Sequence, residues 1–469
     1  MIRKAGYLGV GVVLGAAAAA TAPQMLMFAS PAAYAAAADT YRQLNLFGDV
    51  FDKIRNDYVE KPDESKMIEA AINGMLSSLD PHSSYMDAKS FRDMQVQTKG
   101  EFGGLGIEVT QEDGLLKVVT PIDDTPAAKA GVLSGDIITA IDDSSTQGLT
   151  LDQAVEKMRG SINSPVKLKI VRGAKKDVKD FTIVRDLIHV QSVRSHVEDG
   201  DIGYIRITQF TEQTGDGLKS AMEKLHSDIP ADKFKGYILD LRNNPGGLLD
   251  QSIDVVNSFV DRGEIVSTRG RTADETQRFD AKPGGDLSGG KPLVVLINGG
   301  SASASEIVSG ALQDHKRATL IGTRSFGKGS VQTIMPLGEN GALRLTTARY
   351  YTPSGRSIQA KGIEPDVKVL EDVPDDLKGK DDMKGEASLK GHLANGAEDT
   401  SASQAYVPPN EKDDKQLTAA IDLLHGVKHP EPAVKADAAP VKGDPATAAA
   451  PATSPAPTDP GQATPAKPN

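Results

Sequence analysis

Two glycine-rich turns and one lysine carry the residues of this chain that could act in acyl transfer. The strand-like run PLVVLI is followed by NGGSASASE (298–306), and a helix is predicted to begin at Ser303. Such a turn exposes a serine hydroxyl and points backbone N–H groups at one spot, as a nucleophile and its oxyanion require. A serine at a helix start also serves as an N-cap, and the run holds three serines, so spacing alone does not select one.

A lysine is the best candidate for the base that must accompany a serine nucleophile. No GxSxG or GxSGG motif occurs, and His315 lies about 18 Å along a helix from Ser303. Lys328 lies in the compact turn GTRSFGKGSVQ, and serine–lysine pairs are an established variant of the serine triad. To act as a base, Lys328 needs a pKa lowered from about 10.4 towards neutrality, which burial among apolar groups can achieve.

The composition excludes several classes of function. The chain has 469 residues, with 53 Lys and Arg against 64 Asp and Glu, and a formal net charge of −11. It has no cysteine, which excludes disulfides, thiolate metal sites and a cysteine nucleophile. The acidic balance and an aromatic content of only 4% argue against nucleic acid as a partner. No cofactor and no metal are expected.

Both ends of the chain are predicted to lie outside the folded body. A basic start precedes an apolar stretch (5–22) and small residues at 33–35, the pattern of a secretory signal peptide. We therefore expect residues 1–38 to direct export to the periplasm or cell envelope, with a membrane anchor as the alternative. Residues 427–469 are rich in Pro and Ala and predict a disordered tail, and 372–412, rich in Asp, Lys and Gly, predict a linker.

Periodicity divides the remainder of the chain. Apolar residues at helical spacing predict two amphipathic helices within 39–98, able to cover the body or a second subunit, and a short docking helix within 413–426. Short strands with Gly-rich turns fill 99–185. Strands and helices alternate over 186–371, which predicts an α/β sheet covered on both faces. Ligands bind such sheets where strands end, which is where NNPGG (243–247) and the serine-rich turn occur.

Residues 99–185 resemble a PDZ domain in the order of their strands and helices. Gly104, Leu105, Gly106 and Ile107 lie where that family has its carboxylate-binding loop, and AGVLSGDIITAIDD follows. Consecutive N–H groups in a Gly-rich turn can cradle an anionic chain terminus while the next strand pairs with the peptide. The resemblance implies that these four residues bind C-terminal tails, whereas GGLG taken alone fits a plain hairpin turn equally well.

The motifs DLRNNPGG, GGSASASEI, GTRSFGKGSVQ and YYTPSGRSIQAKGIEPDV, after a PDZ segment, resemble the carboxy-terminal processing proteases over about residues 40–425. The resemblance implies a multidomain α/β fold whose protease core (186–371) is of the ClpP and crotonase type. It also implies site residues: Ser303 as nucleophile, Lys328 as general base, Gln332 as the residue that orients the lysine, and backbone N–H groups of Gly247 or Gly246 and of Ala304 as oxyanion donors.

Two functions are compatible with this pattern. The first is an exported serine endopeptidase that uses a Ser–Lys dyad on proteins whose C-terminal tails a PDZ domain recognises. The alternative is a PDZ-based binding scaffold with an inactive protease-like domain, against which the intact serine, lysine and glutamine argue. The expected partners are tails of exported or envelope proteins and further copies of the chain. An adaptor protein and membrane association through the N-terminus are also compatible with the pattern.

Overall fold

The computed structural model describes residues 31–427 except 113, 123, 174–175, 376, 380–381 and 397, and it leaves out the side chains of 31–38 and 152. Most of the predicted signal peptide and of the Pro/Ala-rich tail therefore lies outside the described residues. Among the described helices, none has both the length and the apolar character that a membrane span requires.

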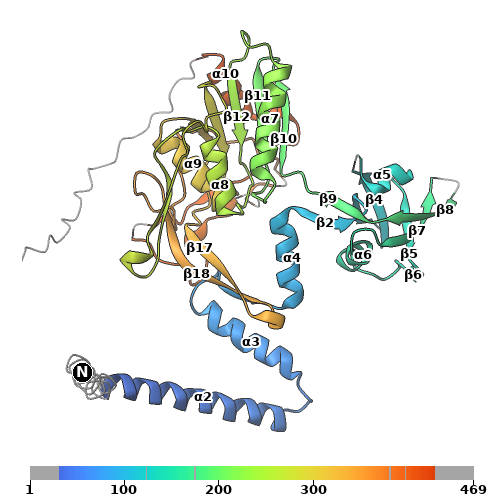
Figure 1. Cartoon of the computed structure of the whole chain (residues 1–469), viewed down its shortest axis with the longest axis vertical. Helices are drawn as coiled ribbons and strands as arrows, with labels where there is room; N and C mark the ends of the chain where they lie inside the picture. The colour runs from blue at the N-terminus through green and yellow to red at the C-terminus, as the bar shows by residue number, and fades with distance from the viewer. Residues whose placement is uncertain are drawn as a thin grey trace, which may run out of the picture. The chain divides into compact units, whose positions relative to one another are not determined.

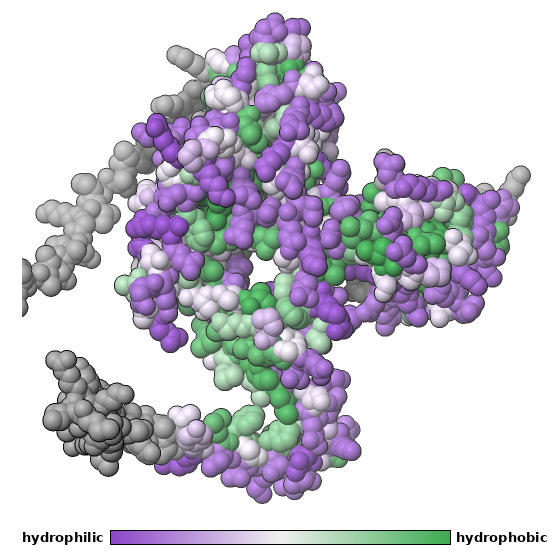
Figure 2. Space-filling view, in the orientation of Figure 1, coloured by the Kyte–Doolittle hydropathy of each residue, from purple (hydrophilic) through white to green (hydrophobic). Residues whose placement is uncertain are grey.

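The N-terminal segment forms the two predicted amphipathic helices. They are α2 (Pro31–Asp57) and α3 (Glu64–Ser77), and Asp63 caps α3 by accepting the N–H of Lys66. Strand β1 (Ser84–Met86) and helix α4 (Ala88–Lys99) follow. Apolar side chains on α2 and α3 remain exposed, and Figure 2 shows this green surface; the largest include Leu44, Phe47, Ile68 and Met75.

A five-strand path with two helices forms the segment that resembles a PDZ domain. Its strand order is β3-β4-β5-β7-β8, which places β3 at an edge. Along β7 the residues Val166, Leu168 and Ile170 alternate into a core of their own, as a half-buried strand requires. The elements are β3 (Ile107–Glu112), β4 (Leu115–Pro121), α5 (Pro126–Ala130), β5 (Ile137–Ile141), β6 (Ser144–Ser145), α6 (Leu151–Met158), β7 (Pro165–Arg172) and β8 (Asp177–Val184). The chain enters and leaves through an antiparallel pair, β2 (Glu101–Gly104) and β9 (Asp186–His189).

A six-stranded sheet forms the centre of the predicted α/β segment, which is called the α/β body below. Its strand order is β10-β11-β12-β15-β16-β19. Only β10 is antiparallel to its neighbour. Helices α7, α8 and α9 cover one face and α10 the other, which confirms the predicted α/β arrangement (Figure 1). The elements are β10 (Val193–Glu198), β11 (Ile202–Ile207), α7 (Thr214–Asp228), β12 (Gly236–Asp240), α8 (Leu249–Asn257), β15 (Leu293–Ile297), α9 (Ala304–Asp314), β16 (Thr319–Gly322), β19 (Val367–Lys368) and α10 (Lys415–Leu424).

A second sheet connects the N-terminal segment to this body. Strand β18 (Ala342–Tyr351) pairs with β1, with β17 (Ser330–Pro336) and with β13 (Glu264–Arg269), which pairs with β14 (Gln277–Asp280). The pairing of β17 with β18 sets Gln332 opposite Thr346. The chain also contains four short 3-10 turns, which are η1 (Ala273–Glu275), η2 (Gly338–Asn340), η3 (Glu386–Ser388) and η4 (Glu411–Asp413).

Residues 372–412 differ from the predicted linker because they pack against the α/β body. Strands β20 (Asp382–Lys384) and β21 (Ala402–Gln404) pair with each other, and Glu386 is fully buried. Ser403 donates its hydroxyl to the carbonyl of Arg324 at 2.6 Å. Hydrogen bonds of this kind hold the segment in place of the apolar contacts that its composition lacks.

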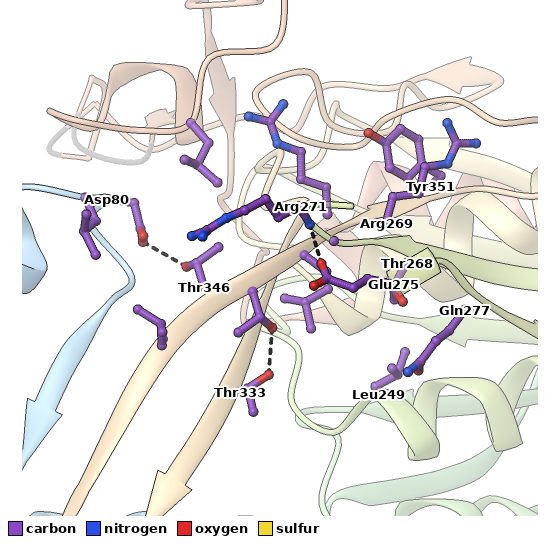
Figure 3. Close-up of a pocket in the computed structure, with 18 residues that line it drawn as sticks. Asp80, Leu249, Thr268, Arg269, Arg271, Glu275, Gln277, Thr333, Thr346 and Tyr351 are labelled. Atoms are coloured by element: carbon purple, nitrogen blue, oxygen red, sulfur yellow. Dashed lines mark hydrogen bonds between the residues drawn. The ribbon is translucent and has the colours of Figure 1, made fainter. Parts of the chain in front are cut away.

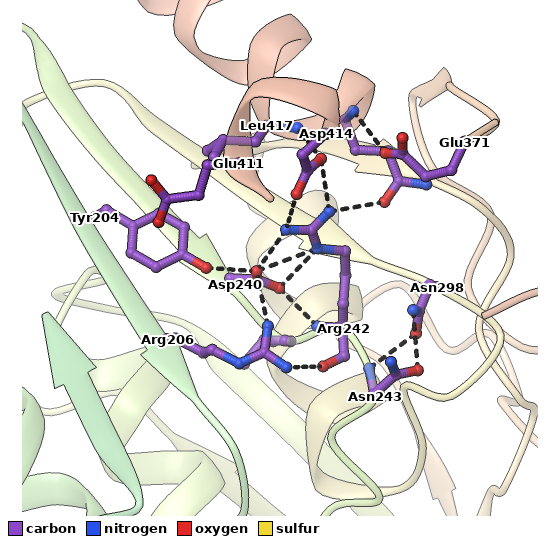
Figure 4. Close-up of polar contacts among 12 residues, drawn as sticks. Tyr204, Arg206, Asp240, Arg242, Asn243, Asn298, Glu371, Glu411, Asp414 and Leu417 are labelled. Carbon is purple, nitrogen blue, oxygen red and sulfur yellow. Dashed lines mark hydrogen bonds and ion pairs between the residues drawn. The ribbon is translucent and has the colours of Figure 1, made fainter. Parts of the chain in front are cut away.

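A buried ionic cluster fixes α10 beside the end of β12. Arg242 pairs with Asp240 at 2.7 Å and with Asp414, the N-cap of α10, at 2.8 Å (Figure 4). Burial by itself raises the pKa of Asp240, but the guanidinium of Arg242, helped by Arg206, outweighs it and holds that pKa below its usual value. The cluster therefore anchors α10 to Asp240 and Arg242, the residues that lie directly before the NNPGG turn.

Candidate active site

The turn after β12 and the turn after β15 meet at one edge of the central sheet. The carbonyl of Asn244 accepts the N–H of Ala302 at 3.0 Å and the hydroxyl of Ser305 at 2.9 Å. Ser301 donates its hydroxyl to the carbonyl of Leu241 at 2.8 Å. Two of the three serines thus join the turns to each other, which leaves the third for another role.

Ser303 is the serine that the local structure sets apart. Ser301 and Ser305 are fully buried and donate their hydroxyls to backbone carbonyls, whereas the hydroxyl of Ser303 donates to no group within the described residues and takes part only as an acceptor in a capping box with Glu306. Its backbone has φ 55° and ψ −113°, a strained conformation for a residue other than glycine. Ser303 lines a cavity of about 630 Å3. Strain of this kind is typical of residues held for function rather than for capping.

Two backbone N–H groups beside Ser303 have no partner within the described residues. They belong to Gly247 and Ala304. The N–H of Gly246, the other predicted oxyanion donor, is donated to the side-chain oxygen of Asn244 at 2.9 Å. A Cβ on Gly246 would lie 2.9 Å from the Ala304 nitrogen, so only glycine allows the two turns this close approach. The structure therefore favours Gly247 over Gly246.

Glu306, which sequence reasoning missed, links the turn of Ser303 to the turn of Lys328. Its buried carboxylate accepts the N–H of Ser303 at 2.8 Å, of Gly327 at 2.6 Å and of Lys328 at 2.9 Å, and the hydroxyl of Ser325 at 2.5 Å. Burial raises the pKa of Glu306 to about 7 against these hydrogen bonds, which lower it. A glutamate three residues after a serine at a helix start is a capping-box pattern, and it would have found this residue.

Lys328 lines the same cavity as Ser303. No hydrogen bond joins the two side chains within the described residues, and catalytic contacts in a ligand-free site often tighten only when substrate binds. Burial lowers the pKa of Lys328, and Arg344 lowers it further. The carboxylates of Glu386, Glu306 and Asp80 act in the opposite direction. The net lowering is the direction that a lysine base requires.

Gln332 also lines the cavity, but its amide nitrogen is committed elsewhere. It donates to Ser330 Oγ at 2.9 Å and to Thr346 Oγ1 at 3.2 Å. Thr346 donates in turn to the carboxylate of Asp80 at 3.0 Å. The Gln332 carbonyl oxygen has no donor within the described residues, so it is available to accept a hydrogen bond from an amine.

A second chain of hydrogen bonds ends at Gly329, the residue after Lys328. His82 lies 2.8 Å from the buried carboxylate of Glu386, which accepts the amide of Gln359 at 2.9 Å. Gln359 in turn accepts the N–H of Gly329 at 3.0 Å. The contact between His82 and Glu386 joins residues 304 positions apart, so no local pattern could have revealed it.

The predicted carboxylate loop precedes the edge strand of the PDZ sheet. The carbonyls of Leu105 and Gly106 accept the N–H groups of Ala127 and Ile122, whereas their own N–H groups have no partner within the described residues. Gly106 has φ 73°, and a Cβ there would lie 2.3 Å from Thr125 Cβ. Free N–H groups beside the unpaired edge of β3 suit the addition of a peptide strand.

Comparison with known families gives three matches along the chain. Residues 201–369 match peptidase family S41, 117–172 match the PDZ domain, and 12–90 match the N-terminal domain of the activating protease CtpB. The first match contains the two turns, Ser303 and Lys328.

Individual relatives are similar over most of the chain. A carboxy-terminal-processing protease of Bartonella bacilliformis is 57% identical over 428 residues, 91% of this chain and 96% of that protein. The carboxy-terminal processing protease CtpA of Bacillus subtilis is 37% identical over 70% of this chain and 69% of its own length. Among solved structures, a photosystem II D1 C-terminal processing protease is 29% identical, covers 71% of this chain and 95% of its own, and has a TM-score of 0.41.

Proposed function

The chain belongs to the carboxy-terminal processing proteases of peptidase family S41 and is a serine-type peptidase; we propose that Ser303 is its nucleophile and Lys328 its general base. The observation that carries the proposal is that both side chains line one cavity while the carboxylate of Glu306 holds both backbones. A strained serine with a free hydroxyl beside a lysine of lowered pKa has the parts of a nucleophile and its base.

In the proposed reaction, neutral Lys328 takes the proton of Ser303 Oγ as that oxygen attacks the carbonyl carbon of the substrate. The N–H groups of Gly247 and Ala304 stabilise the negative charge that develops on the carbonyl oxygen. The ammonium of Lys328 then protonates the leaving amine, and water releases the acyl group by the reverse sequence. The Gln332 carbonyl accepts a hydrogen bond from Lys328 and so orients it. No step needs a metal or cofactor.

The PDZ domain supports recognition of substrates by their C-terminal tails. The terminal carboxylate would bind the free N–H groups of Leu105 and Gly106, and the preceding residues would pair with β3 as an added strand. No observation favours the alternative of an inactive scaffold.

Export and self-association complete the proposal. The basic and apolar start of the chain supports a signal peptide and a periplasmic or envelope location, with envelope proteins as substrates. The exposed apolar side chains of α2 and α3 support burial against another copy of the chain. Mass spectrometry of the native N-terminus tests the first, since an intact Met1 would contradict cleavage. Light scattering tests the second, since a monomer at micromolar concentration would contradict it.

The decisive experiment for the dyad is cleavage of an unstructured protein such as β-casein by the purified chain. The wild type should degrade it, and Ser303→Ala, whose fold should be unchanged, should not. Ser309→Ala is the matched control and should keep the wild-type activity, because its hydroxyl bonds only to the backbone of its own helix and does not join the two turns. Cleavage by Ser303→Ala at the wild-type rate would contradict the proposal.

A further inference from the structure

A larger cavity adjoins the candidate active site. Its volume is about 980 Å3, and Leu249 and Val331 line both it and the cavity of Ser303. This volume is at the upper end of ordinary ligand pockets, so the cavity can hold several residues of a peptide. A polypeptide lying across Ser303 can therefore continue into it without leaving the protein surface.

Three arginines line this cavity without an acidic partner. Arg269, Arg271 and Arg349 form no ion pair within the described part of the chain. Arg269 lies with its guanidinium carbon 3.9 Å from the centre of the Tyr351 ring, and Arg349 donates to the carbonyl of Ala394 at 3.0 Å. These contacts fix the position of both guanidinium groups and leave other N–H donors free.

The two acidic residues that line the cavity are already satisfied. Asp80 is buried and accepts the hydroxyls of Ser83 and Thr346. Glu275 accepts the backbone N–H of Arg271 at 2.6 Å (Figure 3). The three arginines outnumber these two carboxylates, so the lining of the cavity carries a net positive charge in a chain whose net charge is −11. Figure 3 shows that Arg269 and Arg271 come from the β13–β14 region and that Thr333 and Thr346 come from β17 and β18.

We propose that this cavity is a substrate subsite that binds a carboxylate-bearing stretch of polypeptide next to the scissile bond. A planar guanidinium binds a carboxylate through two parallel hydrogen bonds, and three guanidinium groups lining one cavity select acidic over neutral segments. The carboxylate belongs to an acidic side chain or to the chain terminus, since both present the same group. The inference rests on the proposed function, because it treats Ser303 as the point of cleavage.

The test measures binding to the full chain carrying Ser303→Ala, which needs no turnover. Four fluorescent peptides share one sequence with either internal Glu or internal Gln residues, each as the free acid and as the C-terminal amide. The anisotropy of each is followed with Ser303→Ala alone, with added Arg271→Gln, and with added Arg262→Gln. Arg271 is exposed and its side chain forms no hydrogen bond or ion pair within the described residues, and Arg262 is an exposed arginine outside the cavity, so both variants should fold.

We expect the Glu peptides to bind about threefold to fivefold more tightly than the Gln peptides, the range of a partly exposed ion pair. Arg271→Gln should lower that ratio, because one of the three guanidinium groups is lost, and Arg262→Gln should leave it unchanged. If Arg271→Gln instead lowers the ratio of the affinities of the free-acid and the amide peptides, the cavity holds the terminal carboxylate. The inference is overturned if Arg271→Gln changes neither of these two affinity ratios. It is also overturned if Arg262→Gln lowers the same ratio as much as Arg271→Gln does. Cleavage of any peptide by Ser303→Ala would overturn the dyad instead and leave the binding result standing.

Discussion

The backbone N–H of Ser303 donates to the carboxylate of Glu306 at 2.8 Å, and the same carboxylate accepts the N–H of Lys328 at 2.9 Å. One buried side chain thus sets the separation of two turns that lie 25 residues apart in sequence. Because it bonds backbone rather than side chains, it positions both groups while leaving the hydroxyl and the amine free to react. Glu306 is therefore a positioning residue for the proposed dyad.

Glu306→Gln should lower kcat strongly while KM changes little. An amide keeps one acceptor oxygen but places an NH2 group among the N–H donors that the carboxylate accepts, so at least one of these contacts becomes repulsive. Steady-state kinetics on a peptide, with circular dichroism to verify folding, measures the effect. A folded Glu306→Gln chain with wild-type kcat would contradict the positioning role.

The same residue predicts opposite pH trends for activity and stability. Its pKa of about 7 means that acid protonates the carboxylate and removes an acceptor, so activity should fall below pH 7. The folded pKa is raised above the unfolded value of about 4.5, so the stability it contributes is complete below pH 4.5 and is lost as the pH rises through 7. Relative to Glu306→Gln, which does not titrate, the wild type should lose up to about 3 kcal/mol over that range. Urea unfolding of both chains across the range measures this.

Lys328→Ala and Lys328→Arg should both be folded and inactive. Alanine removes the base, and arginine stays charged at any workable pH and cannot accept the serine proton. In the wild type, activity should rise with pH through the lowered pKa of the lysine, and metal chelators should have no effect. Turnover by Lys328→Arg above a few per cent of the wild type, measured on the peptide above, would rule out the dyad.

The neighbours of Lys328 offer a matched pair of variants that move the pH profile in opposite directions. Arg344 lowers the pKa of the lysine, so Arg344→Met should raise it and shift the rise in activity to higher pH. Glu386 raises the pKa of the lysine, so Glu386→Gln should lower it and shift the rise to lower pH. A general loss of structure would reduce the rate without moving the two midpoints apart. Equal midpoints for the two variants would count against Lys328 as the titrating base.

Local pattern accounts for the elements that present the site but not for the contacts that complete it. The helix predicted to begin at Ser303 is found at Ala304–Asp314, and the alternation predicted over 186–371 is found as well, because apolar spacing and turn residues are local signals. The contact between His82 and Glu386 spans 304 positions and depends on how β1 pairs with β18. No spacing rule reports such a contact.

The prediction of a linker over 372–412 is wrong because composition does not show whether polar side chains find partners. Composition counts apolar residues, whereas 372–412 is held by polar ones such as Glu386 and Ser403, whose hydrogen bonds are satisfied inside the protein. Burial of a satisfied polar group carries little cost, so a polar segment can pack as closely as an apolar one. Whether such a segment packs depends on hydrogen-bond partners that lie far away in the sequence, such as Gln359 and Arg324. The sequence of the segment itself does not reveal these partners.

The carboxylate loop of the PDZ domain gives the last prediction. A free C-terminal carboxylate should bind the N–H groups of Leu105 and Gly106, and an amide replaces the charge with a group that only partly satisfies them. The loss should be about 1–3 kcal/mol in binding, and the amidated peptide should be cleaved more slowly at low concentration. Initial rates for a matched free acid and amide, both lacking acidic side chains, measure this.

The control for this prediction must avoid the loop glycine itself. Gly106→Val would strain a backbone at φ 73° and set a Cβ 2.3 Å from Thr125 Cβ, so it would disturb the PDZ fold as well as the ligand. The better control changes only the C-terminus of the peptide and repeats the comparison in Arg271→Gln, where the contribution of the arginine-lined cavity is reduced. Equal rates for acid and amide in an active preparation would leave the PDZ domain without a role in tail recognition.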